Sequence, residues 1–307
     1  MPIKVTMVGE VGLDDIVVEG GPAMWRQPGG GALYSALGAL IWGAQPTICA
    51  AVGETFPDEL LGRIAGAGID VSGVTRVPGD GFSQWLLYEA DGFRRQVPKA
   101  KGAALEDLDG ARERWEGCSS GPVDGVHVAP QSISGQADAI ASAAERGVLA
   151  TLDLMVEPQI DVEAYRSGDV ARGAAALLPN DVEVRQIWGD RPLEELFALL
   201  RDRVGLMCLV VKRGSEGARV VFDSEVVDVP AVSSACVDPT GAGDAFCGGF
   251  LTGLIETGDP VEAALRGAVS ASFAVEGQGA EPLLVPVDEG EVMSRLASAR
   301  QHMRRAA

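Results

Sequence analysis

A short run of small residues beside a carboxylate is the stretch of this sequence best suited to chemistry. Gly-Ala-Gly occupies positions 241 to 243, and Asp244 and an apolar helical pattern follow. If a helix begins there, the backbone N–H groups of Gly241, Ala242 and Gly243 have no acceptor within the helix and form an anion site. A carboxylate would repel a bound phosphate, so Asp244 is better explained as a general base for an attacking hydroxyl. The pattern predicts a phosphotransferase site.

An ordinary helix start is the alternative interpretation of these residues. Asp244 would then complement the helix dipole, and the glycines would relieve packing. The sequence contains no G-K-[ST] triplet of a Walker A loop, and no complete G-x-G-x-x-G occurs at this position. A phosphate site here would therefore be a different device from either of those loops.

Alternating strands and helices would position this site. Apolar β-type runs are separated by segments of helical period, which predicts a three-layer α/β/α, mostly parallel doubly wound (Rossmann-like) sheet. We expect a single domain over residues 1–307. The expected strands cover 3–9, 47–53, 125–129, 148–154, 175–180 and 206–214, and the expected helices cover 31–42, 57–67, 134–145 and 192–203, with two more between 241 and 277.

One segment interrupts the alternation. The run FSQWLLYEADGFRRQVPKAK, from 82 to 101, contains an Asp-Gly pair at 91 and 92, which is a signal for a two-residue hairpin turn. Such a turn would set Glu89 opposite Arg94, with the neighbouring pairs in the same register. We expect this hairpin to project from the sheet.

Composition disfavours several classes of function. The 44 acidic and 25 basic side chains give a formal net charge of -19, which disfavours nucleic acid and anionic membranes as partners. The five cysteines are widely spaced, without a CxxC pair, which indicates reduced thiols. The two histidines cannot form a three-histidine metal site. Because no leader-like N-terminus and no apolar run near ~18 residues occur, we expect a cytoplasmic protein without a membrane segment.

The wider context of Asp244 resembles a known family. The sequence DPTGAGDAFCGGF, from 238 to 250, resembles the C-terminal signature of the ribokinase-like (PfkB) carbohydrate kinases, and other pieces follow in that family's order over nearly the whole chain. The resemblance implies a ribokinase-like fold with a β-lid from about 15–28 and 82–99. It also implies transfer of the γ-phosphoryl group of ATP, with Mg²⁺, to a hydroxyl of a sugar, sugar acid or polyol.

The resemblance near the N-terminus implies a sugar site. In GEVGLD, Asp14 takes the place of the family's sugar-binding aspartate. The segment PGGGALYSALGALIWGA resembles the family's first glycine-rich segment, in which Gly30, paired with Gly29 or Gly31, lets a sugar lie against the backbone. Tyr34 stands in this substrate site where the family usually has Asn, which removes one expected sugar contact.

The resemblance also implies a nucleotide and metal site. LPNDVE resembles the family's N-x-x-E element, so Asn180 and Glu183 would organise Mg²⁺ through water, although Asn180 could simply cap a helix. VVKRGSEGA resembles the nucleotide-binding turn, with Lys212 near ATP and Gly214 and Gly217 permitting the turn, although a plain strand-ending turn would look the same.

Three further residues complete the implied site. Gly279 and Ala280 would border the adenine, and Asp238 would be a candidate ligand of a monovalent cation such as K⁺. Asp153 is a weaker candidate from the residues alone, because it ends the strand-like run ATLDL and ligands bind at the carboxyl ends of parallel strands.

The interrupting hairpin carries a basic cluster that includes Arg95 and Lys99. We hypothesise that these side chains face the site and favour an anionic substrate such as a sugar acid. The alternative is a lid surface on which Glu89 pairs with Arg94. An exposed lid edge could also pair with another chain and form a homodimer.

Three rival functions remain open at this point. GCSSG fits the G-x-S-x-G pattern of α/β-hydrolases with Ser119 as nucleophile, but a strand should precede it and a helix should follow it. A regulator that binds sugar or nucleotide without catalysis would keep the same fold, although it would have no need of Asp244 as a base. A nucleoside kinase would use the same chemistry on a ribose hydroxyl.

Overall fold

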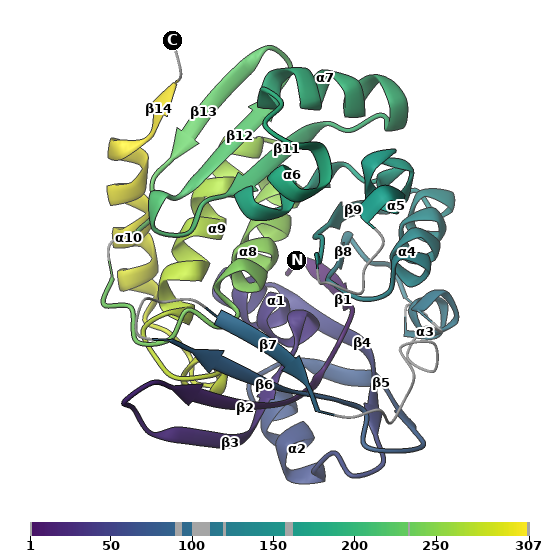
Figure 1. Ribbon diagram of the computed structural model, residues 1–307, viewed down its shortest axis with the longest axis vertical. Helices are drawn as coiled ribbons and strands as arrows, with labels where there is room; N and C mark the ends of the chain where they lie inside the picture. The colour runs from purple at the N-terminus through teal and green to yellow at the C-terminus, as the bar shows by residue number, and fades with distance from the viewer. Residues whose placement is uncertain are drawn as a thin grey trace.

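A mostly parallel sheet forms the centre of the computed structural model, which describes residues 2–89, 94–99, 111–118, 121–156, 162–232 and 234–305 (Figure 1). Seven neighbouring strands are parallel, and the last three at one edge are antiparallel. In sheet order they are β5 (Asp70–Val77), β4 (Gln45–Gly53), β1 (Lys4–Val8), β8 (Gly125–Val128), β9 (Leu149–Leu152), β10 (Ala176–Leu177), β11 (Cys208–Lys212), β12 (Ala218–Phe222), β13 (Glu225–Val229) and β14 (Arg304–Arg305).

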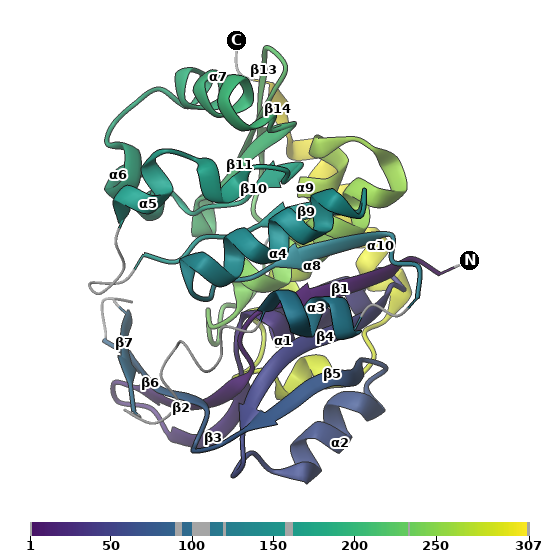
Figure 2. The same ribbon diagram turned by 90° about the vertical axis from the view of Figure 1, so that its right-hand side faces the viewer.

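Helices cover both faces of this sheet, so the predicted three-layer architecture is confirmed (Figures 1 and 2). One face carries α1 (Gly31–Leu40), α8 (Ala242–Thr257), α9 (Pro260–Ala274) and α10 (Glu289–His302), and the other carries α3 (Ala111–Cys118), α4 (Ile133–Glu145), α5 (Val162–Arg166), α6 (Asp181–Trp188) and α7 (Leu193–Val204). The remaining helices are α2 (Asp58–Gly66), which contacts β5, and the 3-10 turns η2 (Asp169–Ala171), η3 (Gly214–Glu216) and η4 (Glu281–Leu284). Among the described residues, none of the helices combines the length and apolar character needed to cross a membrane.

The central strands are buried on both faces, which explains their continuous apolar runs. Along β11, Leu209 and Val211 pack into the core under α4 to α7, whereas Cys208 and Val210 pack into the core under α8 to α10. Side chains alternate between the two faces of a strand, so one short run supplies both cores.

Helices α1 and α8 meet through their backbones. A Cβ atom placed on Gly38 would lie 2.1 Å from the carbonyl oxygen of Ala245, and one placed on Gly248 would lie 1.8 Å from that of Ser35. Neither position can hold a larger residue unless the helices separate. The two helices are therefore fixed to one another by their backbones, and the contacts include the first turns of α8.

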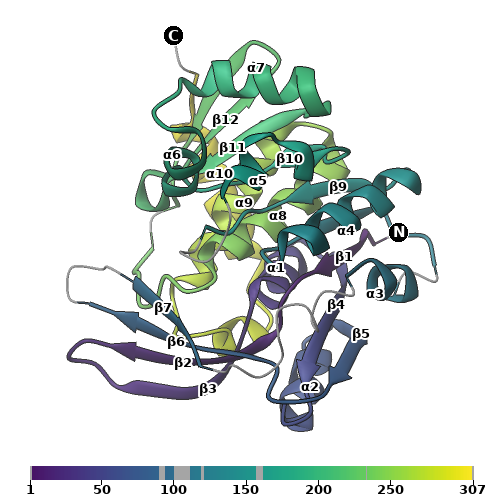
Figure 3. The same cartoon turned by 45° about the vertical axis from the view of Figure 1, so that its right-hand side comes forward.

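A second sheet of four strands stands beside the first (Figure 3). Its order is β3 (Ala23–Gly29), β2 (Gly12–Val18), β6 (Phe82–Tyr88) and β7 (Arg94–Pro98). These strands come from the two segments for which a lid is expected, and we call this sheet the lid. Strands β2 and β6 pair in parallel at its centre, so β3 and β7 are its edges.

The register predicted for the lid hairpin is wrong by one residue. Tyr88 pairs with Arg94, and Leu87 pairs with Arg95, so Glu89 is not opposite Arg94. The predicted Asp-Gly turn lies outside the described residues. Five residues lie between the paired residues Tyr88 and Arg94 in the sequence. A hairpin with a two-residue turn would leave an even number of residues between any two that pair. The shift moves each side chain of β7 to the other face relative to the prediction.

Strand β5 was not predicted, for an identifiable reason. It lies at the edge of the main sheet, and its sequence, DVSGVTRV, is mostly exposed or half-buried. An edge strand of this kind lacks both the continuous apolar run of a central strand and a regular alternation. Its existence is a consequence of pairing with β4 rather than of a local pattern.

Candidate active site

The candidate residues gather at the carboxyl ends of the parallel strands. Asp153 follows β9, Asn180 follows β10, and Lys212 ends β11. Helix α8 begins at the same edge, so its first turn faces the ends of these strands (Figure 1). Ligands bind at this edge in open α/β sheets. The topology therefore brings together residues that are far apart in the sequence.

The anion loop, residues 238–243, is held in place by Asp238. Its Oδ1 accepts hydrogen bonds from the Thr240 amide at 2.9 Å and the Thr240 hydroxyl at 2.6 Å. Its Oδ2 accepts one from the Gly279 amide at 2.9 Å. Asp238 is 2% exposed, and both of its oxygens are used in this way. The geometry supports a structural role, and ligation of a monovalent cation by Asp238 stays a prediction.

The start of α8 differs in one respect from the predicted anion hole. Gly241 is the N-cap residue and has a left-handed backbone, with φ of 73°, which favours glycine. No side chain caps this helix. The amide of Ala242 donates to the carbonyl oxygen of Pro239 at 3.3 Å. The amides of Gly241 and Gly243 are therefore the better candidates for binding an anion.

Glycines let the substrate segment approach both predicted carboxylates. A Cβ atom placed on Gly31 would lie 2.9 Å from Oδ1 of Asp244, and one placed on Gly29 would lie 1.9 Å from Oδ2 of Asp14. Gly30 has φ of 102°, and a Cβ atom placed on it would lie 2.3 Å from the carbonyl oxygen of Glu10. The first glycine-rich segment thus lies between the predicted sugar-binding aspartate and the predicted base.

Tyr34 points into the centre of this arrangement. Its ring covers Gly241 so closely that a Cβ atom there would lie 2.2 Å from the ring. The side chain is buried, and its hydroxyl has no hydrogen-bond partner within the described part of the chain. Burial raises the pKa of the phenol well above its usual value, and the nearby carboxylates of Asp14, Asp238 and Asp244 raise it further. The Tyr34 hydroxyl therefore stays neutral, and its contact with a substrate stays a prediction.

The Asn180 and Glu183 pair forms a helix cap, as its alternative interpretation predicts. Asn180 Oδ1 accepts from the Glu183 amide at 2.8 Å, and Glu183 Oε2 accepts from the Asn180 amide at 2.7 Å. Burial raises the pKa of Glu183 to about 8, and the charge of Asp153 adds to the effect. No cluster of three or more His, Cys, Asp or Glu side chains in the described ranges is arranged to hold a metal ion directly. The residues thus fit a hydrated Mg²⁺, held through water, better than a directly ligated one.

Lys212 and Asp153 form a buried ion pair beside α8. Nζ lies 2.5 Å from Asp153 Oδ2 and 3.6 Å from the Sγ of Cys247. Burial alone would lower the pKa of Lys212, but Asp153 and the other acidic groups around it together outweigh this effect, so the pKa is raised and the ammonium group keeps its proton. The pattern ATLDL predicted only that Asp153 lies at a strand end, so its partner was missed.

The two glycines after Lys212 serve a turn. Gly214 and Gly217 have φ of 54° and 84°, and the Arg213 amide donates to the Gly217 carbonyl at 2.7 Å. A Cβ atom on Gly217 would lie 2.1 Å from the carbonyl oxygen of Val229. The turn interpretation is confirmed, and contact with the nucleotide stays a prediction.

The segment predicted to border adenine lies against the lid. A Cβ atom on Gly279 would be 3.7 Å from side-chain atoms of Gln27 and Ile16. Ala280 is completely buried in the core beneath α1. An adenine contact by these residues stays a prediction.

The basic residues of the lid lie away from Asp14. The Lys99 ammonium contacts the carboxylate of Asp15 and lies 4.6 Å from the centre of the Trp85 ring. Arg95 is 64% exposed in its side chain and pairs with Glu89 at 2.9 Å. Asp15 and Asp14 are consecutive in a strand, so they point to opposite faces. The hypothesis that these cations face the substrate is therefore not supported.

One contact between the lid and the anion loop was not predicted. The hydroxyl of Tyr88, at the end of β6, is hydrogen-bonded to the hydroxyl of Thr240. The alternation along β6 places Tyr88 on the same face as Gln84, which is opposite Asp14 in the register. That alternation could have identified Tyr88 as a residue that faces the site, but not its partner.

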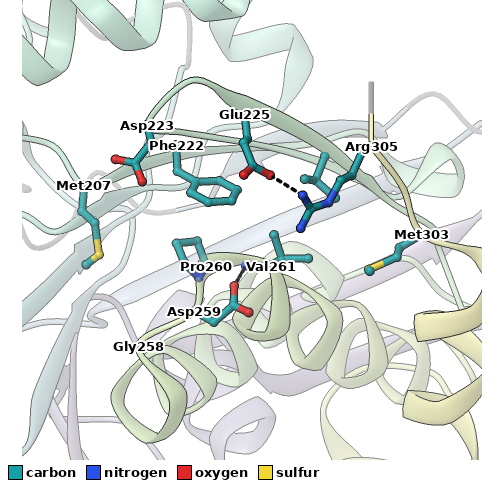
Figure 4. Close-up of a pocket in the computed structure, with 11 residues that line it drawn as sticks. Met207, Phe222, Asp223, Glu225, Gly258, Asp259, Pro260, Val261, Met303 and Arg305 are labelled. Atoms are coloured by element: carbon teal, nitrogen blue, oxygen red, sulfur yellow. Dashed lines mark hydrogen bonds and ion pairs between the residues drawn. The ribbon is translucent and has the colours of Figure 1, made fainter. Parts of the chain in front are cut away.

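A separate pocket of about 480 Å³ lies at the other end of α8 (Figure 4). Its lining includes Asp223, Glu225 and Asp259, and the Arg305 side chain pairs with Glu225 at 3.2 Å. These carboxylates disfavour a bound phosphate because the charges repel, and Asp259 already caps the N-terminus of α9, which also borders the pocket. This pocket is therefore no competitor for the anion loop as a phosphate site.

The hydrolase interpretation does not fit the structure. Ser119 lies outside the described residues, but α3 precedes it and β8 follows it, which is the reverse of the order that a nucleophile elbow needs. His127 is buried in β8, and burial lowers its pKa to about 3. Its Nδ1 is hydrogen-bonded to the Thr151 hydroxyl at 2.9 Å. It is therefore not placed to act as a base for Ser119.

Comparison with known proteins agrees with this geometry. A 2-dehydro-3-deoxygluconokinase from Thermoproteus tenax is 30% identical over 261 residues, which cover 78% of this chain and 77% of the relative. A cytidine kinase from Thermococcus kodakarensis is 27% identical over 273 residues, which cover 86% and 92%.

The fold has solved counterparts. An Escherichia coli protein, provisionally described as ribokinase II and solved with ATP and Mg²⁺, has a TM-score of 0.75 at 20% identity, with 97% of this chain and 100% of the other covered. The family model for pfkB family carbohydrate kinases matches residues 4–286, which include the anion loop. By that match over nearly its whole length, this chain is a member of the pfkB family of carbohydrate kinases.

Proposed function

We propose that this protein transfers the γ-phosphoryl group of ATP to a hydroxyl of a small carbohydrate. The observation that carries the proposal is the convergence of two separate motifs. Gly31, from the glycine-rich segment, lies against the carboxylate of Asp244, while Tyr34 from the same helix covers Gly241 of the anion loop. An acceptor beside Gly30 and Asp14 would thus lie close to both the base and the phosphate site.

Each residue has a distinct part in this reaction. Asp14 would orient the acceptor by accepting hydrogen bonds from its hydroxyls, and Asp244 would take the proton of the attacking hydroxyl. The amides of Gly241 and Gly243 would stabilise the charge of the transferred group. Mg²⁺ bound with ATP would neutralise phosphate charge, and Asn180 and Glu183 would hold it through water. The lid would exclude water when it closes over the acceptor.

The test is ADP release with a panel of pentoses, hexoses, sugar acids, polyols and nucleosides. We expect a strong signal with one class of acceptor. Asp244→Asn should reduce turnover by about two to four orders of magnitude with little change in nucleotide affinity. Turnover close to that of the wild type in this variant would refute the mechanism. ATP binding without transfer to any compound would favour a regulator that binds ligands without catalysis.

A nucleoside kinase is the second candidate, because the cytidine kinase relative matches 86% of this chain. The chemistry would be the same, with a ribose hydroxyl as the acceptor. The panel separates the two candidates, since a nucleoside kinase should use cytidine or inosine far better than free ribose. The buried hydroxyl of Tyr34 could serve either acceptor.

We also propose that the enzyme works in the cytoplasm. The described cysteines are all free thiols, which suits a reducing cytoplasm.

The outer face of the lid exposes Trp25 by 55% and Val97 by 43%, and β3 and β7 have unpaired edges within the sheet. We expect a second copy of the chain to cover this surface. Trp25→Glu should then shift the mass in analytical ultracentrifugation from dimer to monomer, and an unchanged mass would contradict it.

A further inference from the structure

The ion pair between Lys212 and Asp153 has no evident structural need. The two side chains are only 12% and 4% exposed. Burying two charges costs much of what their attraction returns, and apolar residues often serve a core equally well. Apolar side chains make up most of the adjoining cores, and the buried polar side chains of His127 and Gln136 near the pair are uncharged. A charged pair at this position therefore calls for an explanation outside the stability of the fold.

The pair stands where a phosphate would arrive. A Cβ atom placed on Gly243 would lie 3.4 Å from Lys212 Nζ, so the ammonium group borders the first turn of α8. Asp153 holds Nζ from the end of β9, two strands away from β11 (Figure 1). The charge of Asp244 also acts on Lys212. One fixed cation thus lies near the carboxylates of Asp153 and Asp244 and near the carboxyl group of Glu183, which is mostly protonated at neutral pH.

The geometry leaves Lys212 able to bind a further group. An ammonium group has three N–H donors. Asp153 accepts from one, and the Cys247 Sγ lies within reach of a second at 3.6 Å. At least one donor is left for a phosphoryl oxygen. A lysine suits this task because it presents a compact charge that needs no planar partner.

We propose that Lys212 is a catalytic residue that binds the transferred phosphoryl group, and that Asp153 is a positioning residue that holds it there. This inference rests on the proposed kinase function. During transfer, the acceptor oxygen bonds to the γ-phosphorus as the bond from phosphorus to the ADP oxygen breaks, and ADP leaves with the electron pair. The hydroxyl proton goes to Asp244. Lys212 keeps its own proton and stabilises the charge on the phosphoryl oxygens.

A binding measurement tests the position of Lys212 without any acceptor. Calorimetric titration with AMP-PNP and with ADP, each with Mg²⁺, compares a ligand that carries a γ-phosphate with one that does not. We expect Lys212→Met to weaken AMP-PNP binding by about tenfold or more while ADP binding stays within twofold. Cys247→Ala, which removes an uncharged neighbour of both charges, should leave both affinities unchanged. Equal effects of Lys212→Met on the two nucleotides, or none, would overturn the proposal.

A double-variant cycle tests the part of Asp153, with the best acceptor from the panel. We expect kcat to fall at least a hundredfold in Lys212→Met and less in Asp153→Asn. The double variant should be no slower than Lys212→Met, because Asp153 acts through Lys212. Losses that multiply would refute the positioning role. Lys212→Arg, which keeps a positive charge beside Asp153, should retain more kcat than Lys212→Met, and equal loss in both, with thermal unfolding showing that both variants fold, would argue against a role for the charge.

These experiments separate failure of the inference from failure of the kinase mechanism. If Asp244→Asn transfers phosphate like the wild type, the mechanism is wrong, yet the AMP-PNP titration still reports whether Lys212 contacts the γ-phosphate. If Asp244→Asn is inactive and Lys212→Met is fully active, the mechanism stands and the inference about Lys212 is wrong. The double variant removes both buried charges, so thermal unfolding should show it to be at least as stable as Lys212→Met.

Discussion

Helices α1 and α8 meet through their backbones, whereas the lid meets the anion loop through side chains. At Gly38 and Gly248 no methyl group fits between the two helices. The lid, by contrast, reaches the anion loop through the hydroxyls of Tyr88 and Thr240. Backbone packing cannot rearrange without separating the helices, but a hydrogen bond between side chains opens readily. The predicted base and phosphate site are thus held by backbone packing, while the contact between the lid and the anion loop depends on two hydroxyl groups.

The largest effect should come from forcing α1 and α8 apart. Gly248→Ala should lower the free energy of unfolding by about 3 kcal/mol, because the added methyl group meets the Ser35 carbonyl. Urea denaturation measures it. Gly62→Ala is the matched control, since Gly62 is exposed in α2 with no atom near its Cβ position, and it should stabilise the protein by about 0.5–1 kcal/mol. Equal stability of the two variants would break the comparison.

Removing the predicted substrate carboxylate of the lid should act on binding. Asp14→Asn should lower kcat/KM by about 10- to 100-fold, mostly through KM, because hydrogen bonds to a charged group are lost. Asp15→Asn is the control, since Asp15 lies in the same strand but contacts Lys99 on the other face. Steady-state kinetics with the acceptor from the panel decides it. A loss confined to kcat would place Asp14 with the catalytic group instead.

Burial of Glu183 beside the charge of Asp153 should make the stability of the folded protein depend on pH. The pKa of Glu183 is about 8 in the folded protein, against an ordinary value of 4.5. Between these pH values the folded protein keeps a proton that the unfolded chain loses, so stability should fall as pH rises through this range. Glu183→Gln keeps the helix cap and should lose this dependence.

Urea denaturation between pH 5 and pH 8.5, without nucleotide or Mg²⁺, measures the effect. Asp181→Asn is the control, because Asp181 lies in the same first turn but its side chain is 44% exposed. It should keep the profile of the wild type. A Glu183→Gln profile parallel to that of the wild type would show that Glu183 does not titrate in this range.

Loosening the lid should have a smaller effect. Tyr88→Phe removes the bond to Thr240 and should raise KM for the acceptor by about two- to tenfold, with kcat nearly unchanged. Tyr165→Phe makes the same chemical change in the core, where the hydroxyl donates to Gln136 Oε1 at 2.8 Å. It should lower stability without altering KM. A fall in kcat for Tyr88→Phe would mean that the lid also positions the reacting groups.

The smallest effect is expected on the outer face of the lid. Arg95→Met and Lys99→Met should leave the ratio of kcat/KM for acidic and neutral acceptors unchanged, because both cations are paired away from Asp14. The comparison of these ratios needs one sugar acid and the matching neutral sugar. A selective loss with the acid would restore the hypothesis of an anionic substrate.

The anion loop was predictable because its chemistry is local. A helix start with Gly241 and Asp244 specifies a backbone conformation and a carboxylate within a few residues, so the sequence alone indicates both. The alternation of strands and helices similarly predicts the central sheet, since β11 is apolar and buried up to Lys212, its last residue. In both cases the pattern and the structure span the same residues.

The lid and the contacts between motifs were less predictable. A shift of one residue in β7 reverses which face each of its side chains occupies, and the turn signal at 91–92 led to the wrong register. The pairing of Lys212 with Asp153 joins residues 59 positions apart. Neither residue indicates its partner, because the proximity comes from the order of the strands. Ala280 was placed near adenine by resemblance, and only packing shows it in the core.

The hydrogen bond that the Gly279 amide donates to Asp238 links the anion loop to a part of the chain that is synthesised later. The two residues are 41 positions apart, and α8 and α9 lie between them. During synthesis, the predicted catalytic residues, 241–244, leave the ribosome before Gly279, whose amide anchors the loop that carries them. A chain truncated after α9 would carry Asp244 and the anion loop, yet it would lack the amide that holds Asp238 in place. Activity should therefore appear only in chains that extend beyond Gly279.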